Sequence, residues 1–167
     1  MSNIYLVGFM GTGKTSVGRE LARRTKNKFI DLDDLIESRE KRSIPDIFAK
    51  DGEPHFRKLE KETLLEVSKD KGLIVACGGG IVLDRQNIET MKKTGKVICL
   101  SASAQVILER TSRSTHRPLL NVASPKEKIE TLLKARASCY ALADETIDTS
   151  GFSVKQVADS IIKILPD

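Results

Sequence analysis

The sequence predicts an α/β fold, a three-layer structure in which a five-stranded parallel sheet carries helices on both faces. Short apolar runs of strand length alternate with segments of helical periodicity, which is the pattern of consecutive βα units. The first apolar run, Asn3–Val7, leads directly into GFMGTGKT at residues 8–15. This stretch fits G-x-x-x-x-G-K-[ST], the phosphate-binding loop (P-loop) that joins a strand to a helix. The length of 167 residues suits a single P-loop domain spanning residues 1–167.

The P-loop predicts how the protein binds a nucleotide. Its glycines let the backbone curl so that successive N–H groups point inward, and the helix predicted to follow, up to about Thr25, adds the positive end of its dipole. Lys14 can reach the outer phosphates, and the Thr15 hydroxyl can ligate Mg2+. The alternative is a glycine-rich turn that contains a Lys-Thr pair by chance. The predicted ATP-binding residues of the loop are Gly11, Thr12, Gly13, Lys14, Thr15 and Ser16.

Carboxylates follow the second predicted strand, which is short and lies at residues 29–30. Asp31 and Asp33 are two residues apart, so on an extended segment both side chains can point the same way. Ligands of open α/β sheets bind at the carboxyl ends of the strands. One carboxylate could then serve the metal and the other the substrate, and we expect Asp31 to serve Mg2+ together with Thr15. The alternative is that Asp33 or Asp34 only caps the short helix predicted from Leu35 to about Arg39.

Two further helices are predicted before the third strand. One begins at Ile44, and a longer one runs from Glu53 to Ser68 with one apolar face. Arg57 and Glu60 lie one helical turn apart at the edge of that face. A surface ion pair is the simplest interpretation of these two residues.

Three consecutive glycines, Gly78, Gly79 and Gly80, follow the strand predicted at residues 73–77. Glycines at the carboxyl end of a buried strand allow a ligand to approach the backbone closely, although a flexible loop would have the same sequence. The next predicted elements are a helix at residues 86–94, a strand at 96–100 and a helix from Ser103 to about Arg110.

The segment at residues 111–123 has no periodicity and contains Arg113 and Arg117. An irregular segment of this length inside a compact domain is typically functional, and a lid at residues 111–124 is the common case. A lid that carries arginine can exclude water and place positive charge on a transferring phosphoryl group. The alternative is a basic surface loop. By analogy, a P-loop combined with a lid favours the arrangement of the nucleoside-monophosphate kinases.

The helix after this segment carries an arginine on its apolar face. A capping box is predicted at its start, Ser124 to Glu127, and Arg136 falls between Leu132 and Tyr140 on the apolar stripe. A charge on a core-facing line is costly unless it is paired. Arg136 therefore belongs to a structural ion pair or clamps an anionic substrate. The last predicted elements are a strand at residues 145–148 and a helix that begins at a capping box formed by Ser153 and Gln156.

The charge of the chain suits anionic ligands. The net charge of +5 fits ATP and also raises nucleic acid as an alternative partner. Aromatic residues make up only 4% and tryptophan is absent, so platforms for stacked bases are scarce. The basic residues are spread along the chain and mixed with acidic ones. We therefore expect a solvated basic surface and no nucleic-acid partner.

The remaining composition bears on location. No apolar run approaches the roughly 20 residues of a membrane span, and residues 1–15 contain no signal-type segment. We therefore expect a cytoplasmic monomer without a membrane partner. The three cysteines, Cys77, Cys99 and Cys139, lack C-x-x-C spacing and indicate neither a zinc site nor a disulfide framework.

These motifs, in this order and spacing, resemble the shikimate kinase family over nearly the whole chain. The resemblance implies ATP-dependent phosphorylation of the shikimate 3-hydroxyl to shikimate 3-phosphate, with ADP as the second product, in aromatic amino-acid biosynthesis. One Mg2+ ion would accompany ATP, and substrate-binding helices would lie at residues 33–62 of one kinase domain. The motifs are the P-loop, Asp31-Leu32-Asp33, Phe56-Arg57, the triple glycine, Arg117-Pro118-Leu119-Leu120 and Arg136-x-x-x-Tyr140.

The resemblance also implies roles for single residues. Asp33 would contact the substrate hydroxyls, with base catalysis as a further role, and Arg57 and Arg136 would clamp the shikimate carboxylate. Glu60 would hold the Arg57 guanidinium in place. The backbone at Gly78, Gly79 and Gly80 would line the same pocket.

On the nucleotide side, the resemblance makes Arg117 the lid arginine on ATP and places Arg110 against the adenine. Lys14, Asp33 and Arg117 would be the catalytic residues. The turn at residues 149–153, expected near the adenine, contains no residue that would recognise the base specifically.

Two other functions stay open on the sequence alone. A related small-molecule kinase acting on gluconate or a nucleoside monophosphate would have the same P-loop and lid, and gluconate is also a hydroxylated carboxylate. A nucleotide switch or a nucleic-acid-binding module would share the P-loop and the positive charge. It would leave Arg136 and the pair Asp31 and Asp33 without a role.

Overall fold

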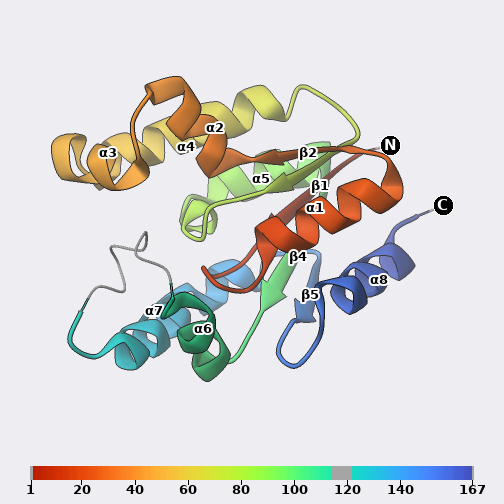
Figure 1. Cartoon of the computed structure of the whole chain (residues 1–167). Coiled ribbons are helices and arrows are strands. Elements are labelled where there is room, and N and C mark those ends of the chain that lie inside the picture. The colour runs from red at the N-terminus through yellow and green to blue at the C-terminus, as the bar shows by residue number, and fades with distance from the viewer. Residues whose placement is uncertain (1, 114–121, 167) are drawn as a thin grey trace.

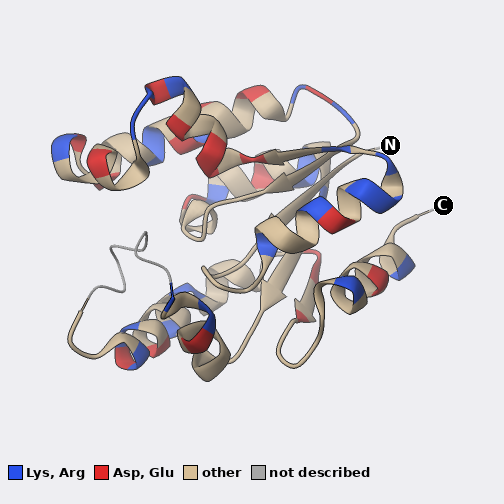
Figure 2. Cartoon of the chain, in the orientation of Figure 1, with Lys and Arg blue, Asp and Glu red and all other residues tan. Residues whose placement is uncertain are grey.

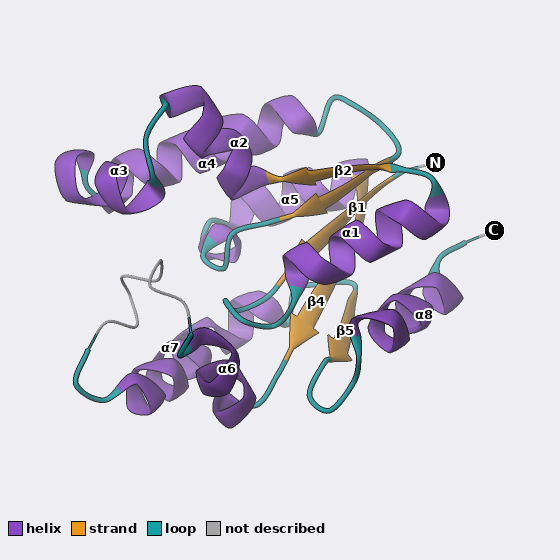
Figure 3. Ribbon diagram, in the orientation of Figure 1, coloured by secondary structure: helices purple, strands orange, loops and turns teal. Residues whose placement is uncertain are grey.

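The computed structural model describes residues 2–113 and 122–166, in which one five-stranded sheet is surrounded by helices (Figures 1 and 3). The strand order is β2-β3-β1-β4-β5, and every neighbouring pair is parallel. The predicted fold class is confirmed, and the strand that leads into the P-loop lies at the centre of the sheet. The strands are β1 (Asn3–Val7), β2 (Lys28–Asp31), β3 (Leu73–Ala76), β4 (Gly95–Ser101) and β5 (Glu145–Asp148).

Both faces of the sheet are buried under helices. Tyr5 and Val7 of β1 belong to one hydrophobic cluster and Ile4 and Leu6 to another, because successive side chains of a strand point to opposite faces. This burial explains why the inner strands β1, β3 and β4 read as largely continuous apolar runs, whereas the edge strands β2 and β5 are more exposed and more polar. Helices α1 (Lys14–Thr25) and α8 (Val154–Ile164) contribute to the cluster with Ile4, and α4 (Glu53–Val67) and α5 (Arg85–Thr94) contribute to the cluster with Tyr5.

Two groups of helices flank the carboxyl ends of the strands (Figure 1). In the first group, Ile36, Ile47 and Phe56 form a small hydrophobic cluster of their own. They join α2 (Leu32–Glu40) and α3 (Ile44–Asp51) to α4. The second group contains α6 (Ala104–Thr111) and α7 (Pro125–Tyr140), and the short helix η1 (Ile81–Leu83) follows the triple glycine.

The prediction that Asp31 and Asp33 share an extended segment is wrong. Asp31 is the last residue of β2 and the N-cap of α2, which begins at Leu32 rather than near Leu35. Its carboxylate accepts hydrogen bonds from the backbone N–H groups of Asp33 and Asp34, at 3.0 and 3.3 Å. Capping by Asp31 stabilises the first turn of the helix earlier in the chain than expected. Asp33 therefore lies on a helix, and neither Asp33 nor Asp34 is the cap.

The two predicted capping boxes have different outcomes. Ser153 and Gln156 form the capping box of α8, with hydrogen bonds of 2.9 and 3.2 Å. Helix α7 begins at Pro125 as expected, but Ser124 makes no side-chain capping bond. The ψ angle of Ser124 is 76°, whereas it is 154° at Ser103 and 159° at Ser153, which both cap their helices. The backbone of Ser124 thus departs from the extended conformation of a capping serine.

The predicted lid falls largely outside the described residues. Thr111 is the last residue of α6, and positions 114–121, which include Arg117, are not described. Among the residues that are described, no helix is long and apolar enough to cross a membrane.

Candidate active site

The P-loop has the curled backbone that its glycines predict. Gly8, Gly11 and Gly13 have φ angles of 138°, 79° and 99°, which L-residues rarely adopt. No side chain would fit at Gly8, because a Cβ there would overlap the carbonyl oxygen of Leu100. The loop therefore curls tightly over the carboxyl end of β1, immediately before the amino terminus of α1.

Side chains hold the P-loop in this shape. The hydroxyl of Thr12 donates to the carbonyl oxygen of Phe9 at 2.7 Å. The buried Thr149, in the turn between β5 and α8, donates from its hydroxyl to the carbonyl oxygen of Thr12 at 2.9 Å. The Lys14 ammonium donates to the carbonyl oxygens of Gly8 and Phe9 at 2.7 and 2.9 Å. Its positive charge consequently lies across the loop, where a nucleotide phosphate would bind.

The two predicted metal ligands lie together. The Thr15 hydroxyl donates to the Asp31 carboxylate at 2.7 Å, across the adjacent ends of α1 and β2. Hard oxygen atoms of this kind suit Mg2+, which keeps several waters and takes other ligands from bound phosphates. The described residues contain no group of three or more His, Cys, Asp or Glu side chains that would form a metal site by themselves. The residues therefore fit an ion that arrives with the nucleotide.

Asp33 and Glu60 form a pair of buried acceptors at Gly78. A Cβ at Gly78 would lie 2.8 Å from Oε2 of Glu60 and 3.0 Å from Oδ1 of Asp33. Both oxygens are buried and have no hydrogen-bond partner in the described part of the chain. Burial and the nearby Glu60 charge raise the pKa of Asp33 to about 7. Unpaired buried oxygens are costly, so these atoms are suited to accept hydrogen bonds from a ligand.

Arg57 lies beside the last glycine of the turn. Its guanidinium donates to Glu60 at 2.9 Å and contacts Glu53 at 3.1 Å. The interpretation of a bland surface ion pair is wrong, because Glu60 has an exposed fraction of 0%. The guanidinium occupies the space that a side chain at Gly80 would need. Glu60 therefore holds Arg57 against the triple glycine, as the resemblance implies.

Arg136 is buried, with only 5% of its surface exposed. Its Cζ lies 5.7 Å from the centre of the Phe9 ring, and its Nη1 lies 3.6 Å from the Cβ position of Gly79. Within residues 2–113 and 122–166, no carboxylate lies within 4 Å of its guanidinium. The structural ion pair offered as an alternative is thus not found there. A buried cation without such a partner is suited to bind an anion.

Most of the predicted residues line two hollows. A pocket of about 350 Å³ contains P-loop residues, Asp31, Asp33, Gly78, Gly79 and Arg110. A second hollow of about 340 Å³ contains Arg57, Glu60 and Gly80. Arg110 lies at the nucleotide end, where its guanidinium donates to the carbonyl oxygen of Gly11 at 3.2 Å and to the Thr149 hydroxyl at 3.0 Å. Of the predicted site residues, only Arg117 lies outside the described residues.

Sequence reasoning missed two contacts of this site. Thr149, in the turn where no base-specific residue was expected, ties Arg110 and the P-loop together through its hydroxyl and carbonyl. Tyr140 donates from α7 to the carbonyl oxygen of Gly79 at 2.7 Å. The only signal for Tyr140 was its position four residues after Arg136, on the same face of the helix. No local pattern marks Thr149.

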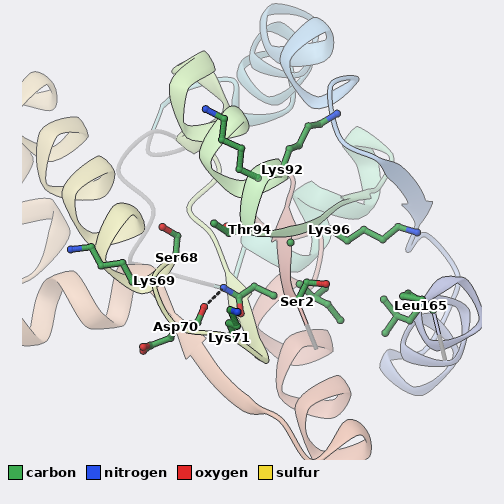
Figure 4. Close-up of a pocket in the computed structure, with 14 residues that line it drawn as sticks. Ser2, Ser68, Lys69, Asp70, Lys71, Lys92, Thr94, Lys96 and Leu165 are labelled. Atoms are coloured by element: carbon green, nitrogen blue, oxygen red, sulfur yellow. Dashed lines mark hydrogen bonds between the residues drawn. The ribbon is translucent and has the colours of Figure 1, made fainter.

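A larger hollow of about 630 Å³ lies at the opposite, amino edge of the sheet (Figure 4). Five lysines contribute to it, so basic residues do gather at this place, although basic and acidic residues are interspersed on the helices (Figure 2). In Figure 4, Lys69, Lys92 and Lys96 extend in different directions. Lys92 and Lys96 pair with Asp144 and Glu145 at 3.2 and 3.6 Å. These ammonium groups do not converge on one point, unlike the groups around the P-loop.

Known proteins resemble this chain in sequence and in fold. The family model described as "Shikimate kinase" matches residues 10–166. A shikimate kinase of Thermodesulfovibrio yellowstonii is 45% identical over 163 residues, covering 98% of this chain and 94% of that protein. The solved structure of shikimate kinase from Acinetobacter baumannii in complex with shikimate has 41% identity and a TM-score of 0.95, covering 98% of this chain and 92% of that one.

A gluconokinase from Sinorhizobium meliloti is a more distant neighbour, with 16% identity and a TM-score of 0.58 over 97% of this chain and 90% of its own. Identity this low shows a likeness of fold alone. The match of a family model to almost the whole chain, together with relatives above 40% identity, carries more weight. The chain therefore belongs to the shikimate kinase family.

Proposed function

We propose that this chain transfers the γ-phosphoryl group of ATP to the 3-hydroxyl of shikimate, giving shikimate 3-phosphate and ADP. Family membership supports the reaction. The observation in the site that supports a carboxylate acceptor is Arg136, a buried arginine beside Gly79 without a carboxylate within 4 Å among the described residues, and the choice of shikimate over gluconate rests on family membership. Such a group needs an anionic partner, and shikimate has a carboxylate.

The donor half of the proposed site is the P-loop. Its backbone N–H groups and the amino end of α1 would bind the ATP phosphates, and the Lys14 ammonium would contact the outer ones. Thr15 and Asp31 would hold Mg2+, which neutralises charge on the phosphates when it is bound. Arg110, held by Thr149, would lie at the adenine end. Arg117 is proposed as the lid arginine on ATP.

The acceptor half is formed by Asp33, Arg57, Arg136 and the triple glycine. The two arginines would bind the carboxylate, because a guanidinium offers paired donors that match the two oxygens. The free oxygen of Asp33 would accept a hydrogen bond from the acceptor hydroxyl. A pKa of about 7 lets Asp33 take up a proton near neutral pH, as a general base must. Alignment and charge stabilisation then supply most of the rate.

We further propose that the protein acts as a monomer in the cytoplasm, with ATP and shikimate as its partners. No contact in this scheme calls for a nucleic acid.

An acceptor panel tests the proposed function. Purified protein with Mg2+ and ATP is offered shikimate, gluconate or a nucleoside monophosphate, and ADP is measured in one coupled assay. Shikimate should stimulate ADP formation strongly, and the other two should stay near the rate without acceptor. Turnover with gluconate alone would assign the chain to a related kinase activity. Nucleotide binding without stimulation by any acceptor would point to a nucleotide switch.

A further inference from the structure

Helix α7 contacts the triple glycine through two side chains. The Tyr140 hydroxyl donates to the carbonyl oxygen of Gly79 at 2.7 Å. Arg136, one helical turn earlier, places Nη1 3.6 Å from the Cβ position of the same glycine. Arg136 has the charge expected of a ligand-binding group. Tyr140 carries no charge, so we infer its role from the peptide unit that its hydroxyl contacts.

The carbonyl group held by Tyr140 belongs to the peptide unit between Gly79 and Gly80. Because a peptide unit is planar and trans, its N–H points away from its carbonyl oxygen. Holding the oxygen of Gly79 therefore fixes the direction of the Gly80 N–H. No acceptor for the N–H groups of Gly79 and Gly80 is recorded among the described residues, so both donors are available to a ligand.

Gly80 lies beside Arg57, one of the two arginines assigned to the substrate carboxylate. The Arg57 guanidinium fills the space where a Gly80 side chain would be, and Gly80 and Arg57 line the same hollow. A hydrogen bond to the carbonyl end of a peptide also polarises its N–H and strengthens it as a donor. Burial raises the pKa of Tyr140 to about 12, so its hydroxyl keeps the proton that it donates.

We propose that Tyr140 is a positioning residue for the acceptor substrate. It orients and polarises the Gly79–Gly80 peptide so that the Gly80 N–H binds the substrate carboxylate together with Arg57 and Arg136. The identity of that carboxylate as the one of shikimate rests on the proposed function. The orientation of the peptide does not.

The first test is kinetic and uses Tyr140→Phe, which removes only the hydroxyl. The KM for shikimate should rise about tenfold, because the misdirected Gly80 N–H would lose its hydrogen bond to the charged substrate carboxylate. The KM for ATP and kcat should stay within about twofold. Tyr5→Phe is the matched control, because Tyr5 is the other of two tyrosines and donates or accepts far from the site, at Thr94 and Asn3. It should leave both KM values unchanged, even if it lowers the melting temperature.

Two kinetic results would overturn the inference. An unchanged KM for shikimate would show that the Tyr140 hydroxyl does not act on substrate binding. Equal increases in the KM for shikimate and for ATP, matched by Tyr5→Phe, would show that tyrosine hydroxyls only stabilise the fold. Failure of the wild-type protein to turn over shikimate would instead contradict the proposed function.

The second test does not depend on turnover. In protein labelled with 15N at its 11 glycines, Tyr140→Phe should shift the Gly80 amide resonance and leave distant Gly72 and Gly151 in place. Shikimate should shift the Gly80 amide in wild-type protein, and less in the variant. A Gly80 amide that does not respond to Tyr140→Phe would overturn the inference, whichever substrate the enzyme uses.

Discussion

Asp33 and Glu60 direct buried carboxylate oxygens at the same backbone position, 3.0 and 2.8 Å from where a Gly78 side chain would begin. Neither oxygen has a hydrogen-bond partner among the described residues. Glu60 is balanced by Arg57 at 2.9 Å, whereas no ion pair of Asp33 is found in residues 2–113 and 122–166. The result is a carboxyl group whose pKa of about 7 lies near neutral pH.

The first prediction concerns catalysis by this carboxylate. Asp33→Asn keeps the shape of the side chain but removes its ability to accept a proton, so kcat should fall by roughly 10² to 10⁴. The KM for ATP should change little, because Asp33 belongs to the acceptor half. Steady-state kinetics with shikimate and ATP measure both. Asp34→Asn, an exposed neighbour outside the pocket, is the control. A kcat that survives Asp33→Asn would limit Asp33 to orienting the hydroxyl.

A second prediction concerns the pH dependence of activity. The charge of Glu60 helps to raise the pKa of Asp33, so Glu60→Gln should lower that pKa. The acid limb of kcat/KM, where Asp33 becomes protonated, should then move to lower pH. Glu53→Gln also removes a partner of Arg57, but Glu53 is not among the charges that act on Asp33. The acid limb of Glu53→Gln should therefore lie at the same pH as in wild type. Equal shifts of the acid limb in both variants would contradict the assignment of this limb to Asp33 and Glu60.

The third prediction links Asp33 to stability. Its pKa is about 7 in the folded protein, above the ordinary value of 3.8. Between these values the folded state binds a proton that the unfolded state has lost, so stability falls as pH rises through this window. Asp33→Asn abolishes that decline. The variant should therefore melt at a higher temperature than wild type at pH 8. The difference between the two melting temperatures should be smaller at pH 4. A variant that is less stable at pH 8 would show that Asp33 gains more from its surroundings than burial costs.

The fourth prediction concerns Arg136. Arg136→Ala should weaken shikimate binding by roughly 2–5 kcal/mol and leave ATP binding nearly unchanged, because a buried anion would lose its partner. Isothermal titration with each ligand measures the two losses. Lys134→Ala, an exposed cation on the same helix, serves as the control. Equal losses for both ligands would indicate that Arg136 supports the fold instead.

Stability offers a further check on Arg136. No carboxylate lies within 4 Å of it in the described part of the chain. Its charge does act on the buried Glu60, but Glu60 keeps its ion pair with Arg57 in Arg136→Ala. The melting temperature of the ligand-free variant should therefore lie close to that of wild type. A large drop would reveal a structural partner.

The Asp31–Asp33 segment shows where prediction from sequence reached its limit. The sequence located the carboxylates at the carboxyl end of the second strand, because apolar periodicity and the P-loop place that end at the ligand edge. It did not locate the beginning of α2, because capping by Asp31 depends on the exact backbone angles at the strand end. The side chains therefore reach the site from a strand end and a helix rather than from one extended segment.

The sequence by itself determined the local units: the strands and helices, the P-loop and the family motifs, since each depends on residues close together in the chain. Only the tertiary structure decided the strand order, the burial of Glu60, the burial of Arg136 and the bond from Tyr140 to Gly79. Tyr140 and Gly79 are 61 residues apart. Local periodicity states which face of an element is buried, but the packing of the whole chain decides what that face meets.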